Sequence, residues 1–398
     1  MTGTALAQAI PVALSPILAR MYTPEDFGLS ALFFALVTIF GSISSGKYEL
    51  AIMLPEKDED AINIFAIGFI LISLISTFLL IIALVFNSKI SLLLGNPSIG
   101  IWLYFVPLVV FITGLYNILL YFNTRRKKYK DIANSTILKS IISVTAQLII
   151  GFLKKGVTGL ITGQILAQLF ANMKLIKNIT NDKVLISNIN KTSILQQAKK
   201  YKNFPKYSVW AGLANTSSQQ LTSILISSLF SIVTLGYYSL VNRVLSMPSS
   251  LIGSSIGHVF FQEATDEKLK FGKINKTFNG TIKKLVFIGL PVFTFLFFII
   301  EDLFIFVFGS NWFEAGLYAK ILIPLFFCRF ISSSLSSVLI IFEKQKMELV
   351  INLILLLSSI VLIYSFDKFT LFLSAFSFVM SANYILFLGY YYKLSFKI

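Results

Sequence analysis

Apolar stretches of about twenty residues follow one another along almost the whole chain, separated by short polar segments. Twenty residues of α-helix extend about 30 Å, which matches the hydrocarbon core of a bilayer. Isolated strands would leave backbone groups unpaired in lipid, and the sequence lacks the alternating ten-residue segments of a membrane barrel. The pattern therefore predicts an all-α polytopic membrane protein with about twelve transmembrane helices.

The longest polar gap, rich in Asn and Lys, covers 177–207 and divides the apolar stretches six and six. We therefore expect an N-terminal six-helix lobe at 1–176, a cytoplasmic linker at 177–207 and a C-terminal six-helix lobe at 208–398. A faint internal echo supports two related lobes, a recurrent transporter design. The predicted spans are 3–20, 27–54, 61–86, 100–122, 131–153, 157–176, 208–230, 235–262, 282–308, 316–342, 348–366 and 370–391.

Lys and Arg are concentrated in every second gap between the spans. Of the 34 basic residues, 24 lie in one alternating set of gaps and at the C-terminal end, and five lie in the other set. Positively charged loops remain on the cytoplasmic side of a membrane. The alternation therefore predicts an even number of spans with both termini in the cytoplasm.

Composition changes the interpretation of this charge. The chain is 56% hydrophobic and only 13% charged, with a net charge of +16 and a mean hydropathy of +0.80. A soluble domain has about a quarter of its residues charged. A basic stripe on such a domain would indicate nucleic-acid binding, but here the basic residues lie in short loops between spans. We expect contact with membrane lipids and no nucleic-acid partner.

The sequence offers little material for catalysis. Its single cysteine, Cys328, and single histidine, His258, exclude a disulfide framework and a Cys- or His-rich metal site. No nucleophile triad or phosphate-binding glycine loop is present. The largest outward loop, 87–99, has about thirteen residues, too few for an outward active-site domain. We therefore expect a transporter, not an enzyme, that needs no cofactor.

Basic residues inside spans are the main candidates for function. A cation near the bilayer centre costs at least about 2.5–3.5 kcal/mol, so it normally faces protein or a watery cavity. Lys320 is near enough to the outer surface to reach it. For the other four, the alternatives are an internal ion pair, such as Lys47 with Glu49, and a cationic cavity for an anionic substrate. The five residues are Lys47, Lys139, Arg243, Lys320 and Arg329.

Two further groups complete the candidate site. Glu49 is a candidate for a carboxylate that couples transport to an H⁺ or Na⁺ gradient, with pairing to a nearby cation as the alternative. Asn215, Gln219 and Gln220 carry amides that suit sugar hydroxyls, and the two neighbouring glutamines point in different directions. Close helix packing explains most of the span serines, and we interpret His258 as a neutral, hydrogen-bonded side chain.

Several segments in both halves resemble one family of bacterial proteins. The first half contains ALAQAIPVALSPILARMYTPEDFG from Ala5, GKYELAIMLP from Gly46 and NTRRKKYK from Asn123. The second half contains FPKYS from Phe204, the pieces LFS and GYYSL, LIGSSIGHVFFQEA from Leu251 and FGSNWFEAG from Phe308. With these segments the chain resembles the oligosaccharide flippases of the polysaccharide transporter family, the O-antigen flippase type of the multidrug/oligosaccharidyl-lipid/polysaccharide exporter superfamily.

This resemblance implies two six-helix lobes around a central cavity in the bacterial cytoplasmic (inner) membrane. It implies a flippase that moves undecaprenyl-pyrophosphate-linked oligosaccharide by alternating access, for O-antigen, lipopolysaccharide or another surface polysaccharide. A polysaccharide polymerase and a chain-length regulator are implied as functional partners. Lys47 and Arg243 would lead the cationic cavity, joined by Arg329 and Lys139. Lys47 replaces the arginine usual in the family, so the charge is kept but bidentate phosphate binding is lost.

Other functions remain as alternatives. A multidrug exporter of the same superfamily would carry cationic drugs and would call for acidic cavities, whereas bases outnumber acids in these spans. A membrane polysaccharide polymerase or ligase would need a large outward loop. A protein that binds lipid head groups through its basic loops is a third alternative. We also expect the true start of translation to lie upstream of Met1, because relatives have a basic segment before the first span.

Overall fold

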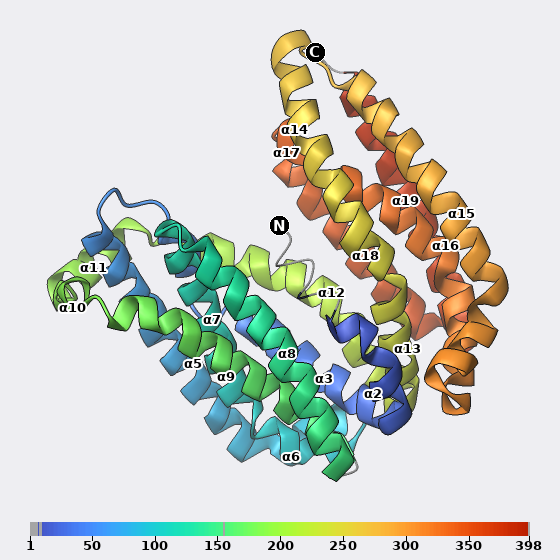
Figure 1. Cartoon of the computed structure of the whole chain (residues 1–398), viewed down its shortest axis with the longest axis horizontal. Helices are drawn as coiled ribbons and strands as arrows, with labels where there is room; N and C mark the ends of the chain where they lie inside the picture. Colours follow the sequence, from blue (N-terminus) through green and yellow to red (C-terminus); the bar gives the residue numbers. More distant parts are fainter. Residues whose placement is uncertain (1–6, 8–9, 154–155, 397–398) are drawn as a thin grey trace. The chain divides into compact units, whose positions relative to one another are not determined.

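The computed structural model describes residues 7, 10–153 and 156–396 (Figure 1). Within these ranges every regular element is helical, and the predicted all-α fold is confirmed. The chain forms two compact units, residues 1–236 and 237–398. The division into lobes at 177–207 stays a prediction.

Nine helical stretches of the described residues are long and apolar enough to cross a membrane. They are Pro24–Gly41, Asp58–Leu93, Val106–Arg125, Tyr129–Leu153, Ile232–Phe271, Asn275–Phe308, Ser310–Ile341, Lys346–Ser365 and Phe369–Ser395. The predicted spans 157–176 and 208–230 are also helical, as α9 (Thr158–Thr180) and α12 (Val209–Leu229), although they are less apolar. The first predicted span, 3–20, lies partly outside the described residues, and α2 (Ser15–Met21) covers its end.

The first unit is built around long antiparallel helices that bury aliphatic and aromatic side chains. Phe122 on α7 and Leu175 on α9 are almost fully buried beside Ile62 on α5. Short helices of the polar gap pack against α5 and α9, so this segment is folded onto the unit. Besides α2, α9 and α12, the elements are α3 (Pro24–Gly41), α4 (Tyr48–Ala51), α5 (Asp58–Leu93), η1 (Pro97–Ile99), α6 (Gly100–Leu103), α7 (Val106–Arg125), α8 (Tyr129–Leu153), α10 (Lys183–Ser187), α11 (Lys191–Lys200) and η2 (Phe204–Ser208).

The second predicted span, 27–54, is interrupted. Its first part is α3, which ends at Gly41, and regular helix resumes only at α4. Gly46 and Lys47 both have φ 62°, in the left-handed region. Glycine adopts this conformation freely, whereas lysine adopts it at a steric cost. The interruption therefore places a strained, charged residue within the predicted second span, between α3 and α4.

Two glycines allow a very close helix crossing within the first unit. A Cβ on Gly28 would lie 1.9 Å from the carbonyl oxygen of Ile232, and one on Gly236 would lie 1.7 Å from that of Pro24. Small residues at such positions let helix backbones approach each other in membranes. The contact is reciprocal, and Phe27-Gly28 and Leu235-Gly236 are matching positions in the echo between the two halves.

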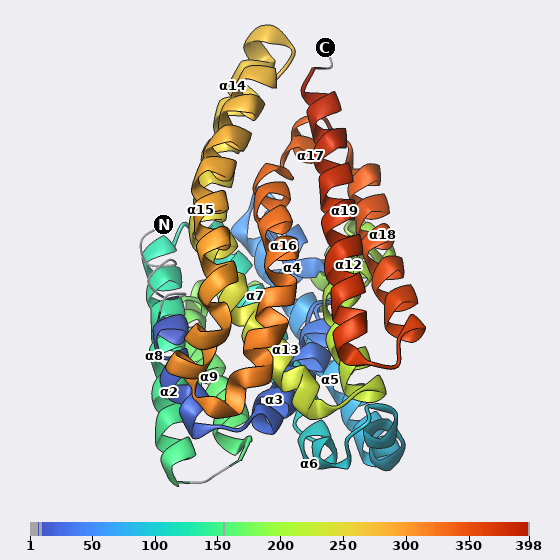
Figure 2. The same cartoon turned by 90° about the vertical axis from the view of Figure 1, so that its right-hand side faces the viewer.

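The second unit is rich in phenylalanine. Phe293 of α15 packs against Phe327 and Phe330 of α16, and α16 lies beside α19 (Figure 2). Pro291 and Pro324 lie inside α15 and α16, where each removes one helix hydrogen bond. The elements are α13 (Ile232–Leu245), which begins in the first unit, then η3 (Ser249–Gly253), α14 (Ser254–Phe271), α15 (Asn275–Phe308), η4 (Ser310–Trp312), α16 (Phe313–Leu335), α17 (Val338–Ile341), α18 (Gln345–Ser365) and α19 (Phe369–Ser395).

Candidate functional site

Lys47 lies at the interruption of the second span and is largely enclosed. Its side chain is 19% exposed, and its Nζ lies 3.8 Å from Oε1 of Glu49. Glu49 is buried, and its other carboxylate oxygen accepts a hydrogen bond from Ser45 Oγ. The ion pair between Lys47 and Glu49, one of the two alternatives for this cation, is therefore present. At 3.8 Å it is long, which leaves the ammonium group capacity for other oxygen partners.

The Lys47 side chain packs against α12. A Cβ on Gly212 would lie 2.5 Å from Cε and 3.0 Å from Nζ of Lys47, so the absence of a side chain there makes room for the cation. Residues 212, 215 and 219 share one face of α12 by helical spacing. Asn215 and Gln219 are exposed on this face, where Gln219 Nε2 donates to Oδ1 of Asn215 over 3.2 Å. The structure thus places a cation and two amides along one helix face.

Gln220 is turned about 100° from Gln219 around the helix axis and is half-buried. The two side chains therefore point in different directions, as predicted. The structure brings Asn215 and Gln219 together and leaves Gln220 on another face of α12.

Lys139 is held separately, on α8. Its Nζ lies 5.0 Å from the centroid of the Tyr116 ring of α7, within the range of a cation–π interaction. An aromatic face partly offsets the loss of water around a half-buried ammonium group, and it leaves the nitrogen without a fixed anionic partner in this contact. Lys139 is thus a cation supported by neutral groups.

The two candidate arginines belong to the second unit, and both are exposed. Arg329 of α16 has its guanidinium carbon 5.8 Å from the Phe326 ring centroid. It also interacts electrostatically with Tyr238 of α13 and Tyr384 of α19. Arg243 lies on α13, five residues after Tyr238. Of the two arginines, Arg329 thus lies near phenol groups, and Arg243 is placed only by its position on α13.

Lys320 differs from the other span cations. Its Nζ lies 2.8 Å from Oε1 of Glu301 and 5.6 Å from the Phe297 ring centroid. The short ion pair between neighbouring helices accounts for both charges. Lys320 and Glu301 are therefore structural partners of each other, and we do not assign them to the candidate site.

The basic run 125–130 has a structural role on the side predicted to be cytoplasmic. Arg125 donates to Asp58 Oδ1 at 2.8 Å and to the carbonyl oxygens of Ile52, Pro55 and Glu56. The Leu185 N–H and Arg126 lower the pKa of Asp182, which caps α10. Arginines 125 and 126 therefore fasten the loop after α4 and the start of α10, and are not spare charges for lipid.

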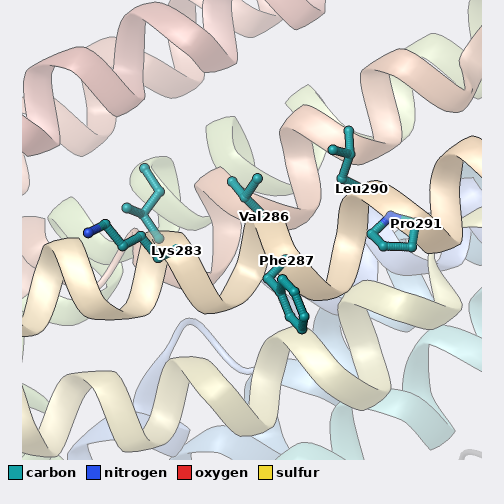
Figure 3. Close-up of a pocket in the computed structure, with 6 residues that line it drawn as sticks. Lys283, Val286, Phe287, Leu290 and Pro291 are labelled. Carbon is teal, nitrogen blue, oxygen red and sulfur yellow. The ribbon is translucent and has the colours of Figure 1, made fainter.

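A recess of about 520 Å³ lies along α15, and all of its lining residues belong to that helix (Figure 3). Val286 and Leu290 point to one side in this view, Phe287 points to the other, and Lys283 supplies the one charged group. Apart from Lys283, the lining residues are apolar and offer no side-chain hydrogen bonds to sugar hydroxyls. We therefore do not assign the recess to the site.

Sequence reasoning missed the residues that support these candidates. Ser45 lies four residues before Glu49, so helical spacing alone would have suggested it. Gly212, Tyr116 and Tyr238 reach their partners only through tertiary packing, and no local signal in the sequence marks them.

A comparison with protein-family models matches residues 17–316 to the family described as "Polysaccharide biosynthesis protein". The chain belongs to this family. The match covers three quarters of the chain and includes Lys47, Glu49, Lys139 and Arg243, whereas Arg329 lies beyond it. Among curated proteins, no sequence matches the chain.

Solved structures show that the chain shares its fold with a lipid II flippase and with multidrug transporters. The lipid II flippase MurJ in an inward closed conformation superimposes with a TM-score of 0.73 at 17% identity, covering 98% of this chain and 86% of that one. An inward-facing multidrug resistance transporter of the MATE family gives 0.71 at 12% identity, covering 99% and 93%. The multidrug transporter DinF-BH gives 0.63 at 14%, covering 98% and 93%.

Proposed function

We propose that this protein is a flippase that moves an undecaprenyl-pyrophosphate-linked oligosaccharide across the bacterial inner membrane by alternating access. The observation that supports this most is the arrangement around Lys47 and α12. Lys47 lies in the predicted second span, between α3 and the short helix α4, beside an exposed helix face that carries two amides. Interrupted helices at membrane depth are characteristic of substrate sites in transporters.

The chemistry of these groups suits the two parts of such a substrate. A pyrophosphate carries negative charge and needs a cationic partner away from bulk water, which Lys47 can supply as a point charge. Sugar hydroxyls both donate and accept hydrogen bonds, and the amides of Asn215 and Gln219 can do the same. Arg243 and Arg329 in the second unit, and Lys139 in the first, would add positive charge for the pyrophosphate or for acidic sugars.

Glu49 is proposed as the coupling carboxylate. Its contacts with Lys47 and Ser45 hold it beside the substrate cation, so a change in its charge would alter the attraction of Lys47 for an anion. Protonation of Glu49 or binding of Na⁺ would thus link an ion gradient to substrate affinity. Loss of gradient dependence in Glu49→Gln, with substrate binding retained, would be the corresponding evidence.

Drug export is a second candidate function, because solved multidrug transporters share the fold of this chain. These structures share under 25% identity with the chain, so the likeness shows the fold alone. A drug cation would need a free carboxylate, whereas Glu49 is engaged by Lys47 and Ser45, and Glu301 by Lys320. The family match also favours polysaccharide biosynthesis, in which a polymerase and a chain-length regulator would act on the product of the flippase.

The test is genetic. Deletion of the gene in its native bacterium should abolish the surface polysaccharide and leave undecaprenyl-linked repeat units on the cytoplasmic leaflet. Plasmid copies with Lys47→Ala or Arg243→Ala should restore display to about a tenth or less of wild type, since each removes one charge-assisted contact of about 1.5–3 kcal/mol.

Immunoblots of membrane fractions should show that both variants accumulate normally, and Lys320→Ala serves as a cation control that retains display. Normal display in both Lys47→Ala and Arg243→Ala would contradict the cationic site. Repeat units that reach the outer leaflet in the deletion strain but remain unpolymerised would indicate a polymerase instead.

A further inference from the structure

A second cavity lies wholly within the second unit, with a volume of about 560 Å³. One wall is formed by η3 and the start of α14, and the other by the end of α16 and α17. Six serines line it: Ser249, Ser254, Ser333, Ser334, Ser336 and Ser337. The volume falls within the range of about 300–1,000 Å³ that is usual for small-molecule sites.

The backbone on both sides of this serine-lined cavity departs from regular α-helix. Ser249–Gly253 is a π-helical turn, in which the N–H of Ser254 bonds to the carbonyl of Ser249. Such turns are rare and are frequently found at functional sites. On the other side, α16 ends at Leu335, and α17 starts at Val338, so Ser336 and Ser337 lie in the break. The regular α-helical hydrogen bonding is therefore interrupted on both walls next to the cavity.

Two glycines set the width of the cavity. A Cβ on Gly253 would lie 2.8 Å from Oγ of Ser334, and one on Gly257 would lie 3.1 Å from the Ser334 carbonyl oxygen. Gly253 and Gly257 therefore let α14 and its π-helical turn pack directly against α16. The remaining space lies beside this contact, where the serine hydroxyls gather.

Two of these hydroxyls are anomalous. Ser254, Ser334 and Ser336 each donate to a carbonyl of their own helical segment. Ser249 Oγ and Ser337 Oγ are buried yet have no hydrogen-bond partner among the described residues. A buried hydroxyl without a partner is unfavourable, and native structures rarely leave one so. One such group lies on each wall of the cavity, and each lacks the hydrogen bond that a polar partner would supply.

The remaining lining residues define the class of ligand. None of them is Lys, Arg, Asp or Glu, so nothing here would balance a pyrophosphate or another ionic group. The cavity is far larger than a single metal ion needs. His258 is exposed in it and offers a donor and an acceptor, and Phe261 supplies an aromatic surface. Hydroxyls around an aromatic surface suit a pyranose ring, which has polar edges and apolar C–H faces.

We propose that this serine-lined cavity binds one neutral sugar residue of the transported glycan. Ser249 and Ser337 would hydrogen-bond the sugar hydroxyls from opposite walls, His258 would read a further polar group, and Phe261 would contact the ring. The proposal rests on the flippase function and adds a subsite that selects the glycan independently of the cationic residues. It gives the serines and His258 of 249–258 a role beyond helix packing.

The test separates sugar binding from pyrophosphate binding. The purified full-length protein is titrated with undecaprenyl pyrophosphate, and with the same lipid bearing one N-acetylglucosamine or one galactose, by native mass spectrometry. Wild type should bind at least one of the glycosylated lipids about tenfold more tightly than the bare lipid. Ser249→Ala/Ser337→Ala should lose this advantage, as expected when two hydrogen bonds disappear, and keep its affinity for the bare lipid.

Two controls accompany the double variant. Ser374→Ala removes an exposed hydroxyl that bonds only within α19, and it should retain the sugar advantage. Lys47→Ala should weaken all the lipids by the same factor. An unchanged sugar advantage in Ser249→Ala/Ser337→Ala, or none in wild type, would overturn the sugar site and leave the flippase proposal standing. Failure of wild type to bind any of the lipids would overturn both.

Discussion

At the residue scale, the position of Lys47 separates backbone strain from charge. A lysine at φ 62° is less stable than glycine in the same conformation, and the preceding Gly46 already supplies one left-handed residue. Its ammonium group nevertheless lies between Glu49 and Gly212, where no glycine could place a charge. Strained residues tend to occur at functional sites. The cost at this position is consistent with a requirement for the cation.

We therefore predict that Lys47→Gly separates the cost of the strained backbone from the role of the charge. Relief of the left-handed conformation favours the fold by about 1 kcal/mol, but loss of the ion pair leaves Glu49 buried without its cation and costs more, so the variant should be less stable than wild type. Display of surface polysaccharide should fall as in Lys47→Ala. Thermal unfolding of the purified protein and a glycan assay in the deletion strain measure the two effects.

Glu343→Gly is the matched control, because Glu343 has φ 54° but belongs to none of the candidate sites. It should stabilise the protein by about 1 kcal/mol, because only the left-handed strain is relieved there, and it should leave display intact. Equal loss of display in both variants would show that activity depends on the strained backbone and not on the cation.

At the element scale, the crossing at Gly28 and Gly236 depends on the absence of side chains. Each Cβ would overlap a carbonyl of the other helix, so neither position tolerates even alanine without a backbone shift. The two glycines occupy matching positions in the weak internal sequence similarity between the two halves. That similarity therefore corresponds to a contact between two helices. Membrane helices gain little from burying apolar surface in lipid, so such close backbone contact is an important source of their association.

Gly28→Ala and Gly236→Ala should each destabilise the protein by about 1–3 kcal/mol, the usual cost of forcing extra atoms into a packed contact. Gly389→Ala on α19 is the control, because its Cβ would meet no atom within 4 Å. That change should stabilise the helix by up to about 1 kcal/mol. Thermal unfolding in detergent compares the three, and equal unfolding temperatures would exclude steric contact at the crossing.

At the scale of the whole molecule, the alternating loop charge predicts how the chain threads through the membrane. The apolar helices explain why it is inserted, but helix length is the same in either orientation. Only the positive loops distinguish the two sides. Arg125 and Arg126 hold the segment 52–58 and helix α10 in place. The predicted cytoplasmic side therefore carries a folded structure.

This orientation can be measured by cysteine labelling in a Cys328→Ala background. Lys128→Cys lies in a predicted cytoplasmic loop and Lys89→Cys at a predicted outward end, and both positions are exposed. A membrane-impermeant maleimide should label Lys89→Cys in intact spheroplasts, and should label Lys128→Cys only after the membrane is permeabilised. The reverse pattern would contradict cytoplasmic termini.

The helical fold followed from the sequence because membrane burial leaves few structures that satisfy the backbone. The interruption of the second span did not, since Lys47 lies in a run that reads as continuous helix. The ion pair of Lys47 with Glu49 was among the alternatives, because the residues are near neighbours in sequence. The π-helical turn at 249–253 and the break at Ser336–Ser337 have no comparable sequence signal, and their serines looked like packing residues.

The fold class, the membrane location and the identity of the span cations follow from the sequence alone, because hydropathy and charge are properties of single residues summed over short windows. Helix packing, in contrast, sets which cations are already paired, which helix face accompanies Lys47, and which serine hydroxyls are left without partners. These outcomes depend on contacts between residues far apart in the chain. Such contacts are set by helix packing, on which local sequence carries almost no information.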